Sequence, residues 1–224
     1  SLEAFHQYNR HKAGKWPHSL LATSTHDTKR GEDVRAPLDV LSEMPDEWRH
    51  AALAWREMNA LLKHDSPAPN DEYLLYQTLV GSWTGEDLST YTARIQEYML
   101  KAMREAKTCT SWTDPNEQYE KRTAEFINAI LSSSSFVQEL AAFVEQIAFF
   151  GVFNSLAQVA IKTCSPGVPD FYQGTELWDL TLVDPDNRRP IDYALRKNLL
   201  REIQSRSLSD LLTDWKSGAV KMFA

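Results

Sequence analysis

Apolar residues recur at helical spacing through the middle of the chain, from Pro45 to about residue 165. Within 45–62 the apolar positions lie three and four residues apart, and the same spacing returns in 88–102 and 119–130. This period is typical of amphipathic helices with one buried face. It predicts helices whose apolar faces, rich in aromatic residues, pack into a core: Trp48, Ala52, Trp55, Met58 and Leu62, then Leu88, Tyr91, Ile95, Tyr98 and Ala102, then Tyr119, Phe126, Ile127 and Ile130.

Polar clusters interrupt this pattern and predict the loops. They are HDSPAPND (64–71), GSWTGED (81–87), TCTSWTDPN (108–116) and SSSS (132–135). Their Gly, Pro, Asn, Asp and Ser residues favour turns, so we expect five or six helices joined by short loops. The longest apolar stretch, 141–161, contains Glu145 and several polar amides. It therefore predicts one or two buried helices of a soluble protein rather than a membrane span.

Only two segments resemble β-strands. SLLATST (19–25) changes from apolar to Thr-rich, and GVPDFYQG (167–174) places Val, Phe and Tyr between two glycines. Pro169 would normally restrict the second segment to a sheet edge or a loop. Two short strands at opposite ends of a helical stretch are unusual for an independent fold. We therefore expect the chain to be a part of a larger protein.

A third segment near the end of the chain is rich in turn residues and charge. LVDPDNRRPIDY (182–193) contains Asp-Pro and Asp-Asn pairs, which favour turns. Pro190 is predicted to begin the helix that follows it. The two adjacent arginines beside two aspartates predict either a salt-linked loop clamp or a ligand site, and the clamp is the preferred interpretation.

Composition narrows the class of protein. The chain has 224 residues, 42% of them hydrophobic and 25% charged, as in ordinary globular proteins. Its net charge of −7 disfavours non-specific binding to nucleic acid. Cys109 and Cys164 show no metal or redox spacing, and no signal-peptide pattern opens the chain. We expect a cytoplasmic protein with no metal, no cofactor and no membrane partner.

Three long motifs carry a family resemblance. They are ATSTHDTKRGEDVRA (22–36), SPGVPDFYQGTELWDL (165–180) and LVDPDNRRPIDY (182–193), with LSEMPDEW (41–48) after the first. Together they resemble the maltooligosyl trehalose synthases, a family of the α-amylase superfamily of (β/α)8 barrels. The resemblance covers nearly the whole chain and implies a mainly α fragment of such a barrel, with its last two strands and a large helical insertion. It implies three parts: 1–35 with strand seven and its signature loop, 36–160 as the insertion, and 161–224 with strand eight and the following helices.

The resemblance also implies roles for residues at the C-terminal ends of the two strands, where such barrels carry their chemistry. Asp27 would be the carboxylate that stabilises the transition state by binding the 2- and 3-hydroxyls of the sugar, and His26 would donate a hydrogen bond to the same sugar. Lys29 and Arg30 would steady the glucose at the reducing end. The rim after strand eight would be lined by Asp170, Tyr172, Gln173 and Glu176, although a satisfied polar network is an equally good interpretation of these four.

The implied reaction is an intramolecular transfer that turns the reducing-end α-1,4 linkage of a maltooligosaccharide, an α-1,4-glucan, into an α,α-1,1 linkage. The nucleophile of the superfamily lies in a Gly-x-Arg-x-Asp signature, and the chain contains neither that signature nor an Asp-x-x-x-x-His region. The acid/base Glu would follow on a later strand. We therefore expect the chain alone to be inactive, and its exposed barrel edges to allow self-association.

Two residues depart from the expected family pattern. Gly31 stands where Ser is usual, and Pro37 stands where Arg is usual. Gly31 would loosen the start of the next helix, and Pro37 suits only a first helical turn. They leave the role implied for Asp27 unchanged, while the role of Arg35 stays open, as do those of Asp184, Asp186, Arg188 and Arg189.

Two other interpretations compete with the resemblance. A His-Asp pair occurs in HD-type metal phosphohydrolases, but these need further ligands on helices, and the remaining histidines show no ligand motif. A non-catalytic helical interaction module would account for the middle of the chain. It would not account for the ordered charges of 24–35 and 182–193.

Overall fold

The computed structural model describes residues 1–85 and 87–224; Glu86, within the predicted loop 81–87, lies outside the described residues. Its contacts divide the chain into two units. Unit 1 combines Ser1–Ala36 with Gly151–Ala224, and unit 2 is the continuous segment Pro37–Phe150. Helix α2 (Glu32–Val40) and helix α7 (Ser134–Cys164) each run through a boundary between the units.

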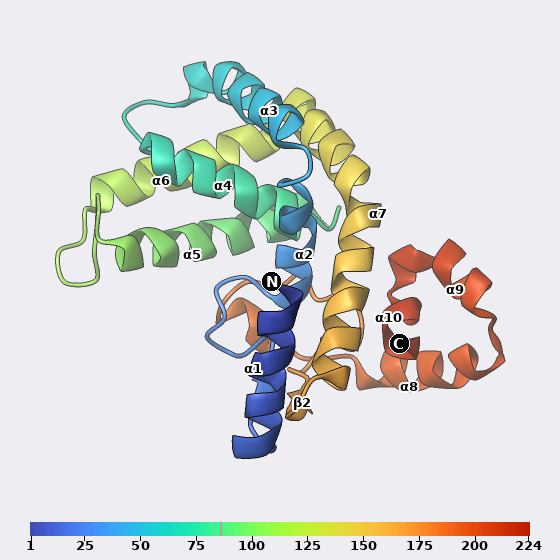
Figure 1. Ribbon diagram of the computed structural model, residues 1–224. Coiled ribbons are helices and arrows are strands. Elements are labelled where there is room, and N and C mark those ends of the chain that lie inside the picture. The colour runs from blue at the N-terminus through green and yellow to red at the C-terminus, as the bar shows by residue number, and fades with distance from the viewer. Residues whose placement is uncertain (86) are drawn as a thin grey trace. The chain divides into compact units, whose positions relative to one another are not determined.

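Unit 2 is helical, as the spacing of apolar residues predicts (Figure 1). The breaks between helices fall at the predicted clusters of turn residues, but the loops are shorter than predicted: residues 69–71 and 81–82 belong to α4, and of 132–135 only Ser133 lies outside a helix. The elements wholly within unit 2 are α3 (Pro45–Met58), η1 (Ala60–Leu62), α4 (Pro69–Ser82), α5 (Leu88–Ala106) and α6 (Glu117–Ser132).

Capping side chains set where these helices begin. Asp87 accepts a hydrogen bond from the Thr90 amide at 2.9 Å at the start of α5, and Asn116 accepts one from the Tyr119 amide at 3.1 Å at the start of α6. Each bond satisfies a backbone N–H that the first turn leaves without a helical partner. The local sequence thus supplies the capping group at both helix starts.

The core of unit 2 is aromatic. Trp55 is 2% exposed, and its ring meets those of Tyr76, Phe136 and Phe143 edge-to-face at 5.6–5.8 Å between centroids. This confirms that the aromatic stripes are core packing. The prediction was too broad at the ends of the helices, where three aliphatic members of the stripes are exposed: Met58, Leu62 and Leu88.

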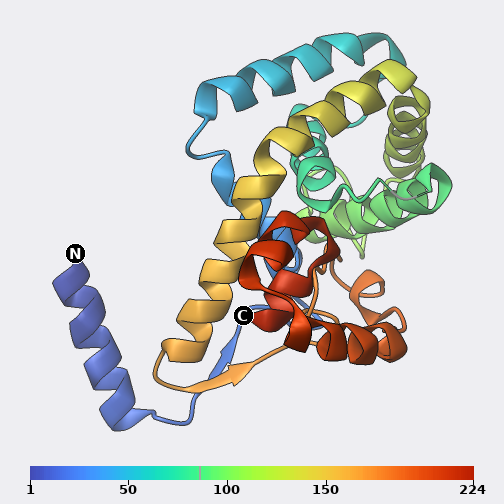
Figure 2. The same ribbon diagram turned by 90° about the vertical axis from the view of Figure 1, so that its right-hand side faces the viewer.

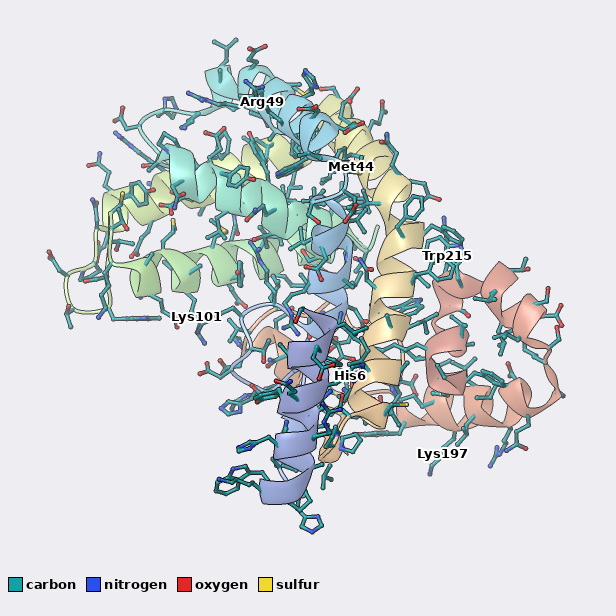
Figure 3. The ribbon with its side chains drawn as sticks, viewed as in Figure 1. His6, Met44, Arg49, Lys101, Lys197 and Trp215 are labelled. Atoms are coloured by element: carbon teal, nitrogen blue, oxygen red, sulfur yellow. The ribbon has the colours of Figure 1, made fainter. Side chains whose placement is uncertain are left out.

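Unit 1 contains the two predicted strands, which pair in parallel (Figure 2). β1 (Leu20–Ala22) and β2 (Val168–Asp170) are in register with Leu20 opposite Val168 and Leu21 opposite Pro169. Pro169 is accommodated because this sheet has only two strands in the described residues, so both strands are edges. α1 (Leu2–Lys15), which precedes β1, has no buried residue, and His6 lies on it among exposed side chains (Figure 3).

Short helices follow β2 in unit 1: η2 (Asp186–Arg188), α8 (Tyr193–Glu202), η3 (Ile203–Ser205), α9 (Leu208–Thr213), η4 (Trp215–Ser217) and α10 (Ala219–Phe223). Four buried residues join them: Ile203, Leu211, Ala219 and Val220. Trp215 packs against this cluster, whereas Lys197 is exposed on α8 (Figure 3). The prediction that Pro190 begins a helix is wrong. Asp192 instead caps α8 by accepting a hydrogen bond from the Leu195 amide at 2.8 Å.

The helices α2 and α7, which run through the boundaries between the units, each bear on a prediction from the sequence. Pro37 lies inside α2, beyond its first turn. The stretch 141–161 forms one helix rather than two, as part of the 31-residue α7. Among the described residues α7 alone is long and apolar enough to cross a membrane, and 33% of its apolar window is buried. The prediction of a buried helix is therefore confirmed only in part, since Phe149, Phe150, Phe153 and Ile161 are exposed.

Candidate functional site

The loop that follows β1 presents the candidate carboxylate Asp27 to solvent. Thr25 and Thr28 fold the loop into a turn: the Thr25 amide donates to Thr28 Oγ1 at 2.9 Å, and the Asp27 amide donates to Thr25 Oγ1 at 3.2 Å. The Asp27 side chain is 69% exposed, and one of its oxygens lies 3.7 Å from Lys29 Nζ. His26 is also exposed. Asp27 is therefore open to a ligand at the tip of a turn held by hydroxyl groups.

A second loop, residues 181–187, runs antiparallel beside this one. The Gly31 amide donates to the Thr181 carbonyl and the Val183 amide donates to the Lys29 carbonyl, both at 3.1 Å, and Arg30 forms an isolated bridge with Leu182. A Cβ at position 31 would lie 3.0 Å from the Thr181 carbonyl oxygen. Gly31 thus permits this close approach of the two loops. The first and third sequence motifs meet here.

The charges of the third motif form the predicted clamp. Arg188 pairs with Asp184 at 3.0 Å, and Arg189 Nε pairs with Asp186 Oδ1 at 3.2 Å. The other oxygen of Asp186 accepts from the Leu182 amide at 2.8 Å. These contacts tie the turn to itself and account for four residues whose roles the sequence left open.

The candidates that follow β2 lie in different surroundings. Tyr172 and Gln173 reach the third motif, where both donate to the Asn187 carbonyl, at 3.3 and 3.5 Å. Glu176 instead pairs with Arg196 at 2.9 Å. The carbonyl of Asp170 accepts from Lys162 Nζ at 3.1 Å. For these residues the polar-network interpretation describes every contact that the structure gives.

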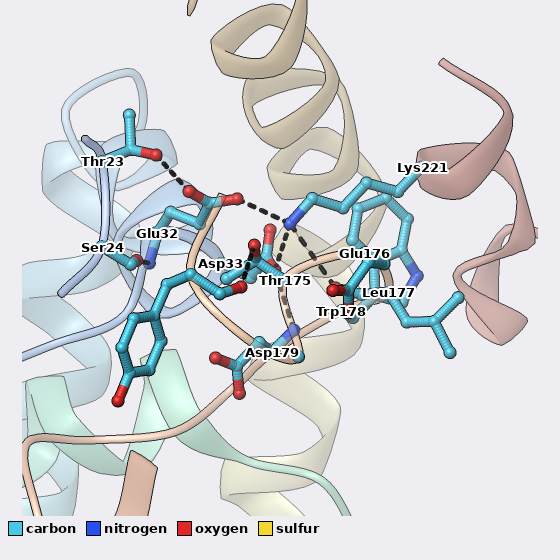
Figure 4. Close-up of polar contacts among 12 residues, drawn as sticks. Thr23, Ser24, Glu32, Asp33, Thr175, Glu176, Leu177, Trp178, Asp179 and Lys221 are labelled. Atoms are coloured by element: carbon cyan, nitrogen blue, oxygen red, sulfur yellow. Dashed lines mark hydrogen bonds and ion pairs between the residues drawn. The ribbon is translucent and has the colours of Figure 1, made fainter. Parts of the chain in front are cut away.

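A buried cluster of charges was not predicted; Figure 4 shows its members Thr23, Glu32, Asp33 and Lys221. Lys221 Nζ lies 2.8 Å from Glu32 Oε1 and 2.7 Å from Asp33 Oδ2, and all three side chains are at most 4% exposed. Lys162 approaches the other oxygen of Glu32 at 3.5 Å, and Thr23 donates to that same oxygen. Because Thr23 follows β1 and Glu32 begins α2, the cluster holds both ends of the loop.

The sequence carries a signal for some members of this cluster and none for others. Glu32 and Asp33 stand in the first motif, and Lys162 interrupts an apolar helix, which marks it as a charge needing a partner. No local pattern points to Lys221. Arg35 completes the support of the loop by donating to the carbonyls of Arg30, at 2.8 Å, and Thr23, at 2.6 Å.

Burial and ion pairing shift the pKa values of the cluster residues in opposite directions. Burial acts to raise the pKa of Glu32, but the Lys221 ammonium and hydrogen bonds from Lys221 and Thr23 outweigh it and the pKa is lowered. Burial raises the pKa of Asp33 and of Asp179, whose amide donates to Asp33 Oδ2 at 2.8 Å. Burial lowers the pKa of Lys162. The carboxylates of Glu32 and Asp33 are at most 4% exposed, so they support the loop rather than face a substrate.

No group of three or more His, Cys, Asp or Glu side chains in residues 1–85 and 87–224 could hold a metal ion. The His26–Asp27 pair therefore lacks, within that part of the chain, the further ligands that the HD-type interpretation requires. This observation does not favour the metal phosphohydrolase.

Comparison with known proteins identifies relatives of much greater length. The chain is 39% identical over 204 residues to a putative maltooligosyl trehalose synthase of Mycobacterium tuberculosis, in both strain CDC 1551 / Oshkosh and strain H37Rv. The matched region is 89% of this chain and 26% of each relative, so the chain spans about a quarter of the length of its curated relatives. No protein-family model matches the chain.

Solved structures agree with the sequence relatives. A crystal structure of a maltooligosyl trehalose synthase superposes with a TM-score of 0.91 at 39% identity, over 100% of this chain and 30% of that one. A hypothetical maltooligosyl trehalose synthase of Sulfolobus tokodaii gives 0.85 at 38% identity, over 100% and 29%. Over most of its length the chain is thus similar to a segment of maltooligosyl trehalose synthases, in sequence and in fold, which confirms the resemblance seen in the motifs.

Proposed function

We propose that the chain is part of an enzyme that converts the reducing-end α-1,4 linkage of a maltooligosaccharide into an α,α-1,1 linkage by intramolecular transglycosylation. The observation that carries the proposal is the exposed Asp27 carboxylate, on a braced turn directly after β1 and within the motif THDTKR. The similarity to a segment of maltooligosyl trehalose synthases supports it.

In this proposal β1 and β2 are neighbouring strands, seven and eight, of a (β/α)8 barrel. Their parallel pairing puts the C-terminal ends of both strands at one edge, so that the loop 24–31 and the loop after Asp170 begin side by side. Active sites of such barrels lie at this edge. The helical segment between the strands is then an insertion.

Asp27 stabilises the transition state by accepting hydrogen bonds from the 2- and 3-hydroxyls of the sugar at the cleaved linkage. These bonds strengthen as the ring flattens towards an oxocarbenium ion, so they lower the barrel enzyme's activation barrier rather than merely hold substrate. His26 donates to the same sugar, and Lys29 and Arg30 steady the released glucose. Tyr172 and Gln173 contribute through the Asn187 backbone, while Asp170 and Glu176 complete the rim.

The covalent steps belong to residues outside this chain. A carboxylate nucleophile attacks the anomeric carbon while a carboxylic acid protonates the leaving oxygen, which releases glucose. The anomeric hydroxyl of that glucose then gives its proton to the carboxylate that had acted as the acid, attacks the glycosyl–enzyme intermediate and displaces the nucleophile. Water must be kept out, because its attack would give hydrolysis.

The experiment uses the longer coding sequence that contains this chain. We expect the region upstream to encode a Gly-x-Arg-x-Asp signature, and the longer protein to convert maltopentaose into a product without a reducing end. The 224-residue chain alone should show no turnover. A longer frame without the signature, or turnover by the chain alone, would contradict the proposal. A cytoplasmic location and self-association through the strand edges stay predictions.

A further inference from the structure

Asn187 contacts the backbone on which Asp27 stands. It lies in η2, and its side chain is buried, with the residue 7% exposed. Its Nδ2 donates two hydrogen bonds, to the Thr25 carbonyl at 3.2 Å and to the His26 carbonyl at 3.0 Å. These are the two peptide carbonyls that immediately precede Asp27. One side chain thus fixes two consecutive peptide planes of the candidate site.

Asn187 is itself held by residues of the loop that follows β2. Tyr172 and Gln173 donate to its carbonyl, and the preceding Asp186 is tied to Leu182 and Arg189. The amide group is therefore presented by a turn that other contacts already fix. A donor on such a support positions its partner accurately, because it cannot follow the partner's motion.

Backbone hydrogen bonds also connect the two loops. The Asp184 amide donates to the His26 carbonyl at 3.4 Å, and the Val183 amide donates to the Lys29 carbonyl at 3.1 Å. They keep the loops adjacent whatever the side chain at 187. The side-chain amide of Asn187 additionally fixes the orientation of the Thr25 and His26 peptides. That orientation sets the direction of the Asp27 Cα–Cβ bond.

We propose that Asn187 is a positioning residue for Asp27, acting through the carbonyls of Thr25 and His26. The proposal rests on the function proposed above. The Asn187 amide does not touch substrate; its loss lets the Asp27 carboxylate move from the sugar hydroxyls. Displacement of a reacting group by about 1 Å costs on the order of 100-fold in rate.

The test uses the full-length enzyme and maltopentaose. Asn187→Asp keeps the shape of the side chain but replaces the donor with oxygens that face two carbonyls. We expect kcat to fall by roughly 100-fold while KM changes by less than about threefold, since the carboxylate acts in the transition state. Asn187→Ala, which removes the donor without adding charge, should lower kcat in the same direction.

Asn59→Asp is the matched control. Asn59 is also a buried asparagine whose Nδ2 donates, to Tyr76 Oη at 3.2 Å, but it lies in unit 2 among core residues. This variant bears the same cost of a buried new carboxylate and should keep kcat per folded molecule within about twofold. Circular dichroism and thermal melts measure the folded fraction of each variant, and kinetics are compared at a temperature where all are folded.

A double mutant separates positioning from a general structural role. If Asn187 acts through Asp27, then Asn187→Asp combined with Asp27→Asn is no slower than Asp27→Asn alone. Folded Asn187 variants with kcat within about threefold of the parent, or multiplicative losses in the double mutant, would overturn the proposal. An active Asp27→Asn enzyme would instead refute the role of Asp27. If the Asn187 variants stay active while Asp27→Asn is inactive, the positioning role of Asn187 is refuted and the proposed function is not.

Discussion

The ammonium nitrogen of Lys221 lies 2.7 Å from Oδ2 of Asp33, although 188 positions separate the two residues along the chain. It also meets Glu32, so one cation near the C-terminus serves two carboxylates at the start of α2. Those carboxylates directly follow the loop that carries Asp27. The geometry of the candidate site consequently depends on a residue from the last helix described.

Replacing Lys221 with Met should destabilise the fold strongly. Asp33 would lose the cation at 2.7 Å and Glu32 would keep only Lys162, at 3.5 Å, and breaking a buried pair costs about 3–5 kcal/mol in the free energy of unfolding. Urea unfolding of the chain measures the loss. Lys197→Met, at an exposed lysine of α8, is the control and should change the free energy by less than about 0.5 kcal/mol. A Lys221→Met loss equal to that of the control would refute the role of the cluster.

The loss caused by Lys221→Met should depend on pH. Burial already raises the pKa of Asp33, and removing the ammonium raises it further. A carboxyl with a raised pKa in the folded state stabilises the fold at pH values below its unfolded pKa and loses that contribution as pH rises. The difference between Lys221→Met and the parent should therefore shrink as pH falls from about 7 to about 4. A constant difference would show that Asp33 does not titrate in this way.

Glu120 should give unit 2 an acid-sensitive stability. Hydrogen bonds from Arg104, at 2.7 and 2.8 Å, hold the pKa of Glu120 below its usual value of 4.5. With a depressed folded-state pKa, the stabilisation is present above the unfolded pKa and is lost as pH falls through the folded pKa. Glu120→Gln should be less stable than the parent at about pH 7 and approach it in acid. Urea unfolding across that range measures both; parallel curves would contradict the assignment.

Trp55 should be a main support of the helical core. Its burial among three aromatic rings predicts a loss of about 3–5 kcal/mol for Trp55→Ala, from lost burial and the cavity left behind. Leu61 is 96% exposed, so Leu61→Ala serves as the control. Thermal unfolding compares the two variants, and similar melting temperatures would be inconsistent with an aromatic core centred on Trp55.

Asp27→Asn should impair catalysis in the full-length enzyme without affecting the fold. The side chain is exposed, so the substitution disturbs no core contact. The neutral amide cannot balance the developing positive charge of the sugar, and kcat should fall by more than about tenfold, or ~1.4 kcal/mol of transition-state stabilisation. Steady-state kinetics on maltopentaose decide the matter, and a smaller loss would count against the role of Asp27.

The sequence predicted the helices of unit 2 well because their signals are local. Apolar spacing marks the buried faces, and turn residues stop each helix where the next loop begins. The start of α8 was misplaced because two local signals compete: Pro190 suits a first helical turn, but Asp192 supplies the capping oxygen that the structure uses.

The supports of the candidate site were largely unpredictable for the opposite reason. The motif around Asp27 and its exposed turn follow from the residues of 22–36, whereas the partners of that loop come from distant segments. Nothing local distinguishes Lys221 from an ordinary surface residue, and the motif around Asn187 indicates a turn but not the partner of its side chain. Their roles arise only when the chain path brings 177–187 and 219–223 beside the loop.

The long sequence separation between the Asp27 loop and its partners also bears on the order in which contacts form during folding. Asn187 meets Thr25 across 162 positions, and closing so large a loop costs conformational entropy that only a compact intervening chain reduces. We expect the helices of unit 2, which pack largely against their neighbours in sequence, to form before these distant contacts. During synthesis the contacts of Lys221 with Glu32 and Asp33 cannot form until residue 221 has left the ribosome.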